Sequence, residues 1–387
     1  MWTPRDFSYR KFRRKVEQDG SANAVKASFE LVARSALGPL VFQRLFEHET
    51  IRSIHRQELL KRATNVVYPE TGTSETASVP FAANVGQGYV FPTTGLVLTD
   101  DGHPVDESVG PAGDDKNGVI KSIVRHAFVD SPSLATDLVT GNTDSLQNRA
   151  RTLDTICPLS YRYKNYYHWT IETLPRVRYA RAYEERTGEE VTYVVWSGAP
   201  PYVAETLDLI GVPERKIERA RAPVYRASNV VVPSFPEQTA TDYEWVREAV
   251  LENIDPNTEP IDVGSNVYIS RTNAVERQVV NESAVVEALS KYGFEPYVLE
   301  SQSVAQNVLL FHEADAIVGA HGAGLTDLIY CEDGVVFELF GSKVKDPYER
   351  LADTVGVDYQ PVRCQPDSTD IAVDVDHLER TIENVLE

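Results

Sequence analysis

The residues best suited to bind phosphate form one glycine-rich segment late in the chain. Residues 316–330 read AIVGAHGAGLTDLIY, an apolar stretch followed by small residues around His321. The pattern predicts a buried strand, a tight turn and the start of a helix. Small residues let a ligand approach the backbone, and a helix N-terminus offers free N–H groups and the positive end of its dipole. We therefore expect a phosphate-binding turn; the alternative is a tight turn around a core histidine.

This segment differs from the two best-known nucleotide motifs. It lacks the Gly-Lys-Ser/Thr of a P-loop, and its glycines do not have the G-x-G-x-x-G spacing of a dinucleotide site. A nicotinamide-dependent enzyme is therefore not expected.

Two arginines precede this turn in the segment YISRTNAVERQVVNE, residues 268–282. Arg271 stands at the end of an expected strand, facing an inter-domain cleft, and Arg277 follows in a loop. Asn281 and Glu282 open the next helix. Guanidinium groups match phosphate oxygens, so the two arginines suit a diphosphate. The alternative is surface salt bridging in an acidic protein.

Two further groups add carboxylate and imidazole chemistry. Glu338 in VVFELF lies among strand hydrophobics, so it needs a partner: either ribose hydroxyls or a buried arginine.

In NYYHWTIETLPR, residues 165–176, His168 and Glu172 are four apart and share one helix face. A histidine steadied by a carboxylate is a usable general base. The nearby aromatic residues, which either stack on a sugar or belong to the core, are Tyr166, Tyr167 and Trp169.

Alternating strands and helices are expected to position these groups. After a linker at residues 255–264, strands are predicted at 267–270, 294–299, 316–319 and 335–340. Helices are predicted at 282–292, 304–313, near 325–330 and at 376–386. This alternation predicts a doubly wound α/β domain whose ligand lies at the carboxyl ends of the strands. Earlier in the chain we expect a helix at 165–185, strands at 191–196 and 229–233, and a helix at 203–210.

The first part of the chain differs in pattern. Residues 1–60 are predicted to be helical, and residues 66–129 favour short strands and turns, with a loop at 113–118. Residues 24–46 carry apolar side chains at helical spacing next to a basic cluster. This helix is expected to pack on its own domain; the alternative is a peripheral membrane contact.

Composition narrows the class of protein. The chain of 387 residues is long enough for two domains, has no apolar run of membrane-spanning length and carries a net charge of −20. Such a charge argues against nucleic-acid binding, and an acidic surface poor in lysine is typical of proteins adapted to high salt. Three cysteines, Cys157, Cys331 and Cys364, without metal or redox spacing favour a reducing, cytoplasmic location.

Taken in order, these motifs resemble glycosyltransferase family 61, the capsular polysaccharide biosynthesis type. The resemblance covers about residues 80–365 and leaves residues 1–60 outside it. The motifs are NYYHWTIETLPR, SRTNAVERQVVNE, SVAQNVLLF, HGAGLTDL and VVFELF.

The resemblance implies a GT-B-like α/β fold: two Rossmann-like domains facing a cleft. We expect a helical extension at 1–60, an acceptor-side domain at 61–250 and a donor-binding domain at 251–387. By matching position, the resemblance implies donor contacts from the arginines, the glycine-rich turn and their motif neighbours. The expected donor site comprises Arg271, Arg277, Asn281, Glu282, Gln306, His321, Gly322, Ala323, Gly324, Leu325 and Glu338. The expected acceptor side comprises Asn165, Tyr167, Trp169, His168 and Glu172.

The implied reaction is inverting transfer of a sugar from a nucleotide diphosphate sugar, without a metal or other cofactor. The expected acceptor is a glycan or lipid-linked glycan, and either His168 or Glu172 is the base. Two alternatives remain: a non-catalytic nucleotide-sugar or glycan-binding module, and a transferase of a non-sugar group to polysaccharide. The presence of both His168 and Glu172 weighs against the binding module.

Overall fold

The computed structural model describes residues 54–69, 79–110, 143–258, 264–274, 276–341, 345–367 and 369–386. These residues divide into two compact units. The first unit takes the described residues of Met1–Lys164, Glu172–Val203 and Val212–Glu237. The second takes those of Asn165–Ile171, Ala204–Gly211 and Gln238–Glu387. The chain thus passes between the units several times, and the expected boundary after residue 250 falls inside helix α9 (Ala240–Asn253).

The second unit is built on a parallel five-stranded sheet in the order β11-β10-β12-β13-β14. The strands are β10 (Asn266–Ile269), β11 (Glu295–Tyr297), β12 (Ala316–Ala320), β13 (Val335–Phe340) and β14 (Asp358–Arg363). Every residue of β12 and β13 is buried, as the unbroken apolar runs predict for central strands. The strand order reverses between β10 and β12. Open α/β sheets bind their ligands at the carboxyl ends of the strands beside such a reversal.

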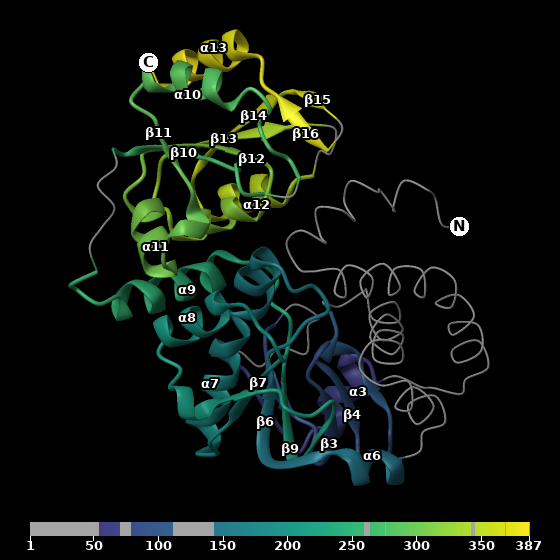
Figure 1. The fold of residues 1–387 in the computed structure, drawn as a ribbon. Helices are drawn as coiled ribbons and strands as arrows, with labels where there is room; N and C mark the ends of the chain where they lie inside the picture. The colour runs from purple at the N-terminus through teal and green to yellow at the C-terminus, as the bar shows by residue number, and fades with distance from the viewer. Residues whose placement is uncertain are drawn as a thin grey trace. The chain divides into compact units, whose positions relative to one another are not determined.

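Helices cover both faces of this sheet. Figure 1 shows α10 (Glu282–Ser290) and α13 (Val375–Leu386) on one face, and α11 (Val304–His312) and α12 (Pro347–Val355) on the other. α9 and α12 pack against η7 (Ala323–Tyr330). η7 is a 3₁₀-helix, where the sequence predicted a helix of unspecified type. A short turn at Leu299–Ser301 and the hairpin β15 (Gln365–Asp367) and β16 (Asp370–Ala372) complete the unit.

The first unit contains a mixed sheet rather than a simple alternation of strands and helices. The order of its strands is β5-β4-β3-β9-β6-β7-β8. In addition, β2 pairs with β9, and β1 pairs with β2. The parallel strands are β9 (Tyr225–Pro233), β6 (Arg151–Pro158), β7 (Thr192–Val195) and β8 (Ile217–Arg219). The antiparallel strands are β1 (Asn65–Val67), β2 (Ala82–Asn84), β3 (Gly88–Phe91), β4 (Leu96–Thr99) and β5 (Pro104–Val105). The parallel part is Rossmann-like.

The helices of this part of the chain are short. They are α3 (Arg56–Arg62), α6 (Thr143–Arg149), α7 (Arg176–Thr187) and α8 (Pro201–Leu209), with 3₁₀ turns at Asp106–Ser108 and Glu214–Lys216. α7 packs against β1, β2 and β9. The amphipathic segment at 24–46 and the loop at 113–118 lie outside the described residues.

The prediction of one helix over residues 165–185 was wrong. The structure has a π-helix, η4 (His168–Thr173), followed by the separate helix α7. Pro175 stands between them, and its missing N–H and its ring prevent a continuous helix at this point. Short π-helices occur often at functional sites. This one carries both His168 and Glu172.

No helix of the described segments is long and apolar enough to cross a bilayer.

Candidate functional site

The reversal of strand order in the second unit brings the predicted phosphate-binding residues together. Arg271 follows β10, and His321 and Gly322 follow β12, the two strands between which the order reverses. The two strands are paired in register through Ile269 and Gly319, so their carboxyl ends lie at the same level. The site is therefore positioned by the sheet itself, and its loops start from fixed points.

The guanidinium of Arg271 lies directly on Gly322. A Cβ atom added to Gly322 would lie 2.2 Å from Nη1 of Arg271, which is closer than any real contact. The other terminal nitrogen, Nη2, donates to the carbonyl of Glu276 at 3.1 Å. Nε is buried and has no hydrogen-bond partner. A side chain at residue 322 would therefore push the Arg271 guanidinium aside, and the Nε–H of Arg271 has no acceptor among the described residues.

Arg277 is held in an uncommon backbone conformation beside Arg271. Its φ of 62° lies in the left-handed region, and its N–H donates to the carbonyl of Thr369 at 2.9 Å. Its Nε is also buried without a hydrogen-bond partner. A strained arginine at the edge of a ligand site is a common feature of binding loops.

Neither arginine forms an ion pair with a carboxylate of the described residues. The negative charge of Glu300 acts on Arg271 only as a weaker influence than burial and Arg277. Burial, and next the positive charge of Arg277, lower the pKa of Arg271. An arginine nevertheless stays protonated at neutral pH. Two adjacent cations with unsatisfied N–H groups are unfavourable on their own, so this arrangement favours binding of an anion with several oxygens.

The N-terminus of η7 lies next to these cations. Gly322 is its N-cap residue, and the first N–H groups of any helix lack acceptors within the helix. Ala323 and Gly324 are half-buried, whereas Leu325 is buried and packs beneath Gly319. Ala323 and Gly324 can therefore meet a ligand through their backbone, and Leu325 belongs to the core.

His321 belongs to a buried hydrogen-bonded chain. Its Nδ1 lies 2.5 Å from Oε1 of Glu338, and the hydroxyl of Tyr359 donates to Oε2 of the same carboxylate at 2.7 Å. Glu338 is fully buried. The sequence left ribose or an arginine as the partner of Glu338, and the structure shows a histidine and a tyrosine instead. The carboxylate thus orients the His321 ring.

Three predicted donor residues have structural partners of their own. Gln306 and Ser303 form the capping box of α11. Asn281 exchanges hydrogen bonds with the backbone of Val373, at 2.8 and 3.0 Å. Glu282 accepts from Tyr268 and Ser270 at 3.1 and 2.8 Å. These contacts give each of the three side chains a role in the fold that needs no ligand.

The segment Asn165–Ile171 belongs to the second unit, as the glycine-rich turn after β12 does. Tyr166 donates from its hydroxyl to Oδ1 of Asp327 in η7 at 2.6 Å. The Tyr167 ring lies edge-on to Tyr348 in α12, with centroids 5.7 Å apart. Tyr348 in turn lies edge-on to His321, at 5.4 Å. His168 therefore follows two residues that are anchored on the elements of the site.

The remaining predicted acceptor residues differ in exposure. The amide oxygen of Asn165, an exposed residue, accepts from the backbone N–H of His168 at 3.0 Å. Trp169 is buried, and its Nε1 donates to Thr206 at 2.8 Å, so its ring belongs to the core. His168 and Glu172 are half-buried. Glu172 is assigned to the first unit and His168 to the second.

Three residues of this site were missed in the sequence: Asp327, Tyr348 and Tyr359. Only Asp327 carried a local signal, since a carboxylate stands inside the apolar helix segment LTDLIY. Such a residue needs a buried partner. The two tyrosines come from α12 and β14, and nothing in their neighbouring sequence indicates which residues they meet.

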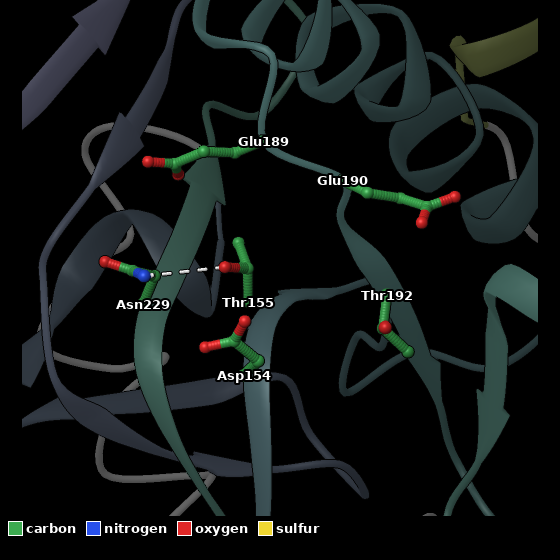
Figure 2. A pocket seen from close by; sticks show the side chains of 6 residues that line it. All are labelled: Asp154, Thr155, Glu189, Glu190, Thr192 and Asn229. Atoms are coloured by element: carbon green, nitrogen blue, oxygen red, sulfur yellow. Dashed lines mark hydrogen bonds between the residues drawn. The ribbon is translucent and has the colours of Figure 1, made fainter.

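A second polar region, in the first unit, is unsuited to a diphosphate. A pocket of about 430 Å³ lies beside the first residue of β7, away from the carboxyl ends of the strands. Figure 2 shows the carboxylates of Asp154, Glu189 and Glu190 around it, with Asn229 hydrogen-bonded to Thr155 at 3.4 Å. Its negative walls would repel a phosphate.

Within the described residues, no group of His, Cys, Asp and Glu side chains is arranged to hold a metal ion.

Replacing Gly322 with alanine is expected to disable the site without unfolding the protein. The φ of Gly322 is 173°, which any residue adopts, so the new methyl group acts only by displacing the Arg271 guanidinium. Losing one charged hydrogen bond costs about 1.5–3 kcal/mol, so affinity for a diphosphate should fall about tenfold or more. Calorimetry checks this. Gly264→Ala, where the added Cβ meets nothing closer than 3.7 Å, is the matched control. Equal affinity of Gly322→Ala and wild type would contradict the placement of the ligand.

Comparisons with known proteins point to one family. Residues 166–337 match the sequence profile of the family described as Glycosyltransferase 61. The EGF domain-specific O-linked N-acetylglucosamine transferase of Drosophila melanogaster is 33% identical over 97 residues, which are 24% of this chain and 18% of that protein. The Gallus gallus protein of the same name is 29% identical over 117 residues, 28% of this chain and 22% of that protein. The matched part thus spans about a fifth of the length of these relatives.

Proposed function

We propose that this protein transfers a sugar from a nucleotide diphosphate sugar to a glycan or lipid-linked glycan, since residues 166–337 match the glycosyltransferase 61 profile. The observation that carries the proposal is Arg271 with the nearby Arg277: both follow β10, neither forms an ion pair among the described residues, and Arg271 lies against the turn that follows β12. Their unsatisfied N–H groups and the N-terminus of η7 suit the diphosphate of such a donor. In this proposal the product is part of a surface polysaccharide or a glycosylated protein.

The charge of the site suits the leaving group of this reaction. When the sugar departs, negative charge grows on the nucleotide diphosphate, and fixed positive groups then stabilise the transition state more than the ground state. In our proposal Arg271 and Arg277 supply that charge together with the N–H groups after His321. No metal is needed for this step.

We propose an inverting mechanism, in which a base removes the acceptor proton as the hydroxyl attacks the anomeric carbon in a single displacement. The proton goes to the base, and the electron pair of the broken bond goes to the diphosphate. His168 is favoured as the base because the residues before it contact η7 and α12. Glu172, four residues later in the same π-helix, is the alternative. The two units would be the two Rossmann-like domains of a GT-B enzyme.

A ligand screen tests the donor. We expect uridine or guanosine diphosphate, or one of their nucleotide sugars, to raise the melting temperature of the protein. The nucleotide sugars tested include those that carry N-acetylglucosamine. A ligand at 100 times its Kd adds about 2.7 kcal/mol to the free energy of unfolding. The matching nucleoside monophosphates should act more weakly, since they lack one phosphate for the arginine pair. The proposal would be overturned if the folded protein were stabilised by no nucleoside diphosphate and no nucleotide sugar, at low salt and at molar salt alike.

A further inference from the structure

A buried hydrogen bond joins the π-helix segment to the phosphate-binding helix within the second unit. The Tyr166 hydroxyl donates to Oδ1 of Asp327 at 2.6 Å. Asp327 is 1% exposed and lies in the middle of η7, whose N-terminus is Gly322. Tyr166 stands two residues before His168. One interaction therefore connects the residue favoured as the base with the residues that would hold the diphosphate.

A carboxylate in this place costs free energy of folding. The side chains around it in η7 are buried, and most are apolar: Leu325, Leu328 and Ile329 lie there with Thr326 and Tyr330. Burial raises the pKa of the Asp327 carboxyl to about 7, and burial also raises the pKa of Tyr166. A well-packed apolar pair of similar volume is often at least as stable as a buried polar pair. Stability alone thus does not account for this pair, whereas its direction and fixed length suit a positioning role.

A second contact supports the same segment. The Tyr167 ring packs edge-on against Tyr348, and Tyr348 packs edge-on against His321. These ring contacts limit how far residue 167 moves from the site, but they leave rotation of the segment free. The hydrogen bond from Tyr166 fixes that rotation, because it is directional.

We propose that Tyr166 and Asp327 act as a positioning pair, which fixes the segment carrying His168 against the phosphate-binding helix. The inference rests on the function proposed above. Neither residue touches the reacting atoms; both act through the place they give to His168. Displacement of a base by about 1 Å is enough to lower a rate about 100-fold.

Four variants separate positioning from stability: Tyr166→Phe, Asp327→Leu, their double variant and Asp327→Asn. Tyr166→Phe removes the hydroxyl that donates to the buried Asp327 carboxylate, and Asp327→Leu removes the carboxylate that accepts from Tyr166. We expect both to lower kcat about 10- to 100-fold, with the donor Kd changed less than about twofold. Asp327→Asn keeps an acceptor oxygen for Tyr166 and should retain most of kcat. The double variant removes both polar groups, so its melting temperature should recover while kcat stays low.

The control is Tyr292→Phe, which removes another tyrosine–carboxylate hydrogen bond, to Glu383 at 2.7 Å, far along the sheet. It should keep the wild-type kcat. Recovery of kcat together with stability in the double variant, or wild-type kcat in Tyr166→Phe, would overturn the positioning role alone. A wild-type protein that neither binds a nucleotide diphosphate nor transfers sugar would overturn the proposed function and this inference with it.

Discussion

Replacement of His168 with alanine is expected to lower the rate of sugar transfer by about 10²- to 10⁴-fold, the usual cost of losing a general base. Donor binding should change little, because no step of donor recognition is assigned to this imidazole. Turnover assays and donor calorimetry on the same preparation measure the two effects separately. Glu172→Ala should show the same behaviour if the carboxylate is the base instead.

Two exposed residues serve as controls for this experiment. His377→Ala in α13 and Glu287→Ala in α10 remove the same chemical groups from the surface of the second unit. Both should transfer at the wild-type rate. If His168→Ala and Glu172→Ala also keep full activity, the assignment of the base is wrong. If only one loses activity, that residue is the base or holds the acceptor hydroxyl.

Replacement of Arg271 with alanine should weaken donor binding and transfer together. Its guanidinium meets negative charge both in the bound donor and in the transition state, so Kd and kcat/KM are both affected. One charged hydrogen bond contributes about 1.5–3 kcal/mol, which corresponds to roughly 10- to 100-fold in affinity. Arg277→Ala should show an effect of similar size. The double variant tests whether the two arginines bind one diphosphate jointly, since their effects would then not be additive.

The same variants should not destabilise the protein without ligand. In that state the charge of Arg277 acts on Arg271, neither arginine has an ion pair among the described residues, and each has a buried Nε without a hydrogen-bond partner. Removing one of them relieves both costs. We therefore expect the melting temperature of Arg271→Ala to equal or exceed that of wild type, and the control Arg380→Ala, on an exposed residue, to change neither property. A large loss of stability would indicate a structural role for the arginine instead.

The architecture of the second unit follows closely from local sequence patterns. The run at residues 316–320 is apolar throughout, the run at 335–340 is apolar except for Glu338, and both are buried central strands. The first unit was harder to predict. Its antiparallel strands are two to four residues long, too short for a clear alternation of polar and apolar side chains. In the second unit, helix α9 and strand β14 were not predicted at all.

The sequence indicated which residues of the second unit would lie near one another better than it indicated which residues their side chains would contact. Arg271, Arg277 and the glycine-rich turn lie together because the order of parallel strands brings their ends together. The partner of Glu338 could not be predicted, because His321 and Tyr359 reach it from two other strand ends. For Gln306 a local sequence signal offers a second role. Its serine three residues earlier is a capping-box signal, and that local role competes with the donor contact implied by the family resemblance.

The central claim is that a nucleotide diphosphate sugar reacts at the arginine pair, and one turnover measurement tests it most directly. Wild type and the Arg271→Ala/Arg277→Ala variant are incubated with a panel of nucleotide diphosphate sugars and an acceptor extract from the protein's own source. Mass spectrometry then measures released nucleoside diphosphate and glycosylated product. We predict equal amounts of both from wild type with at least one donor, and neither above background from the variant. Donor binding without product in wild type, or transfer by the variant at the wild-type rate, would contradict the account.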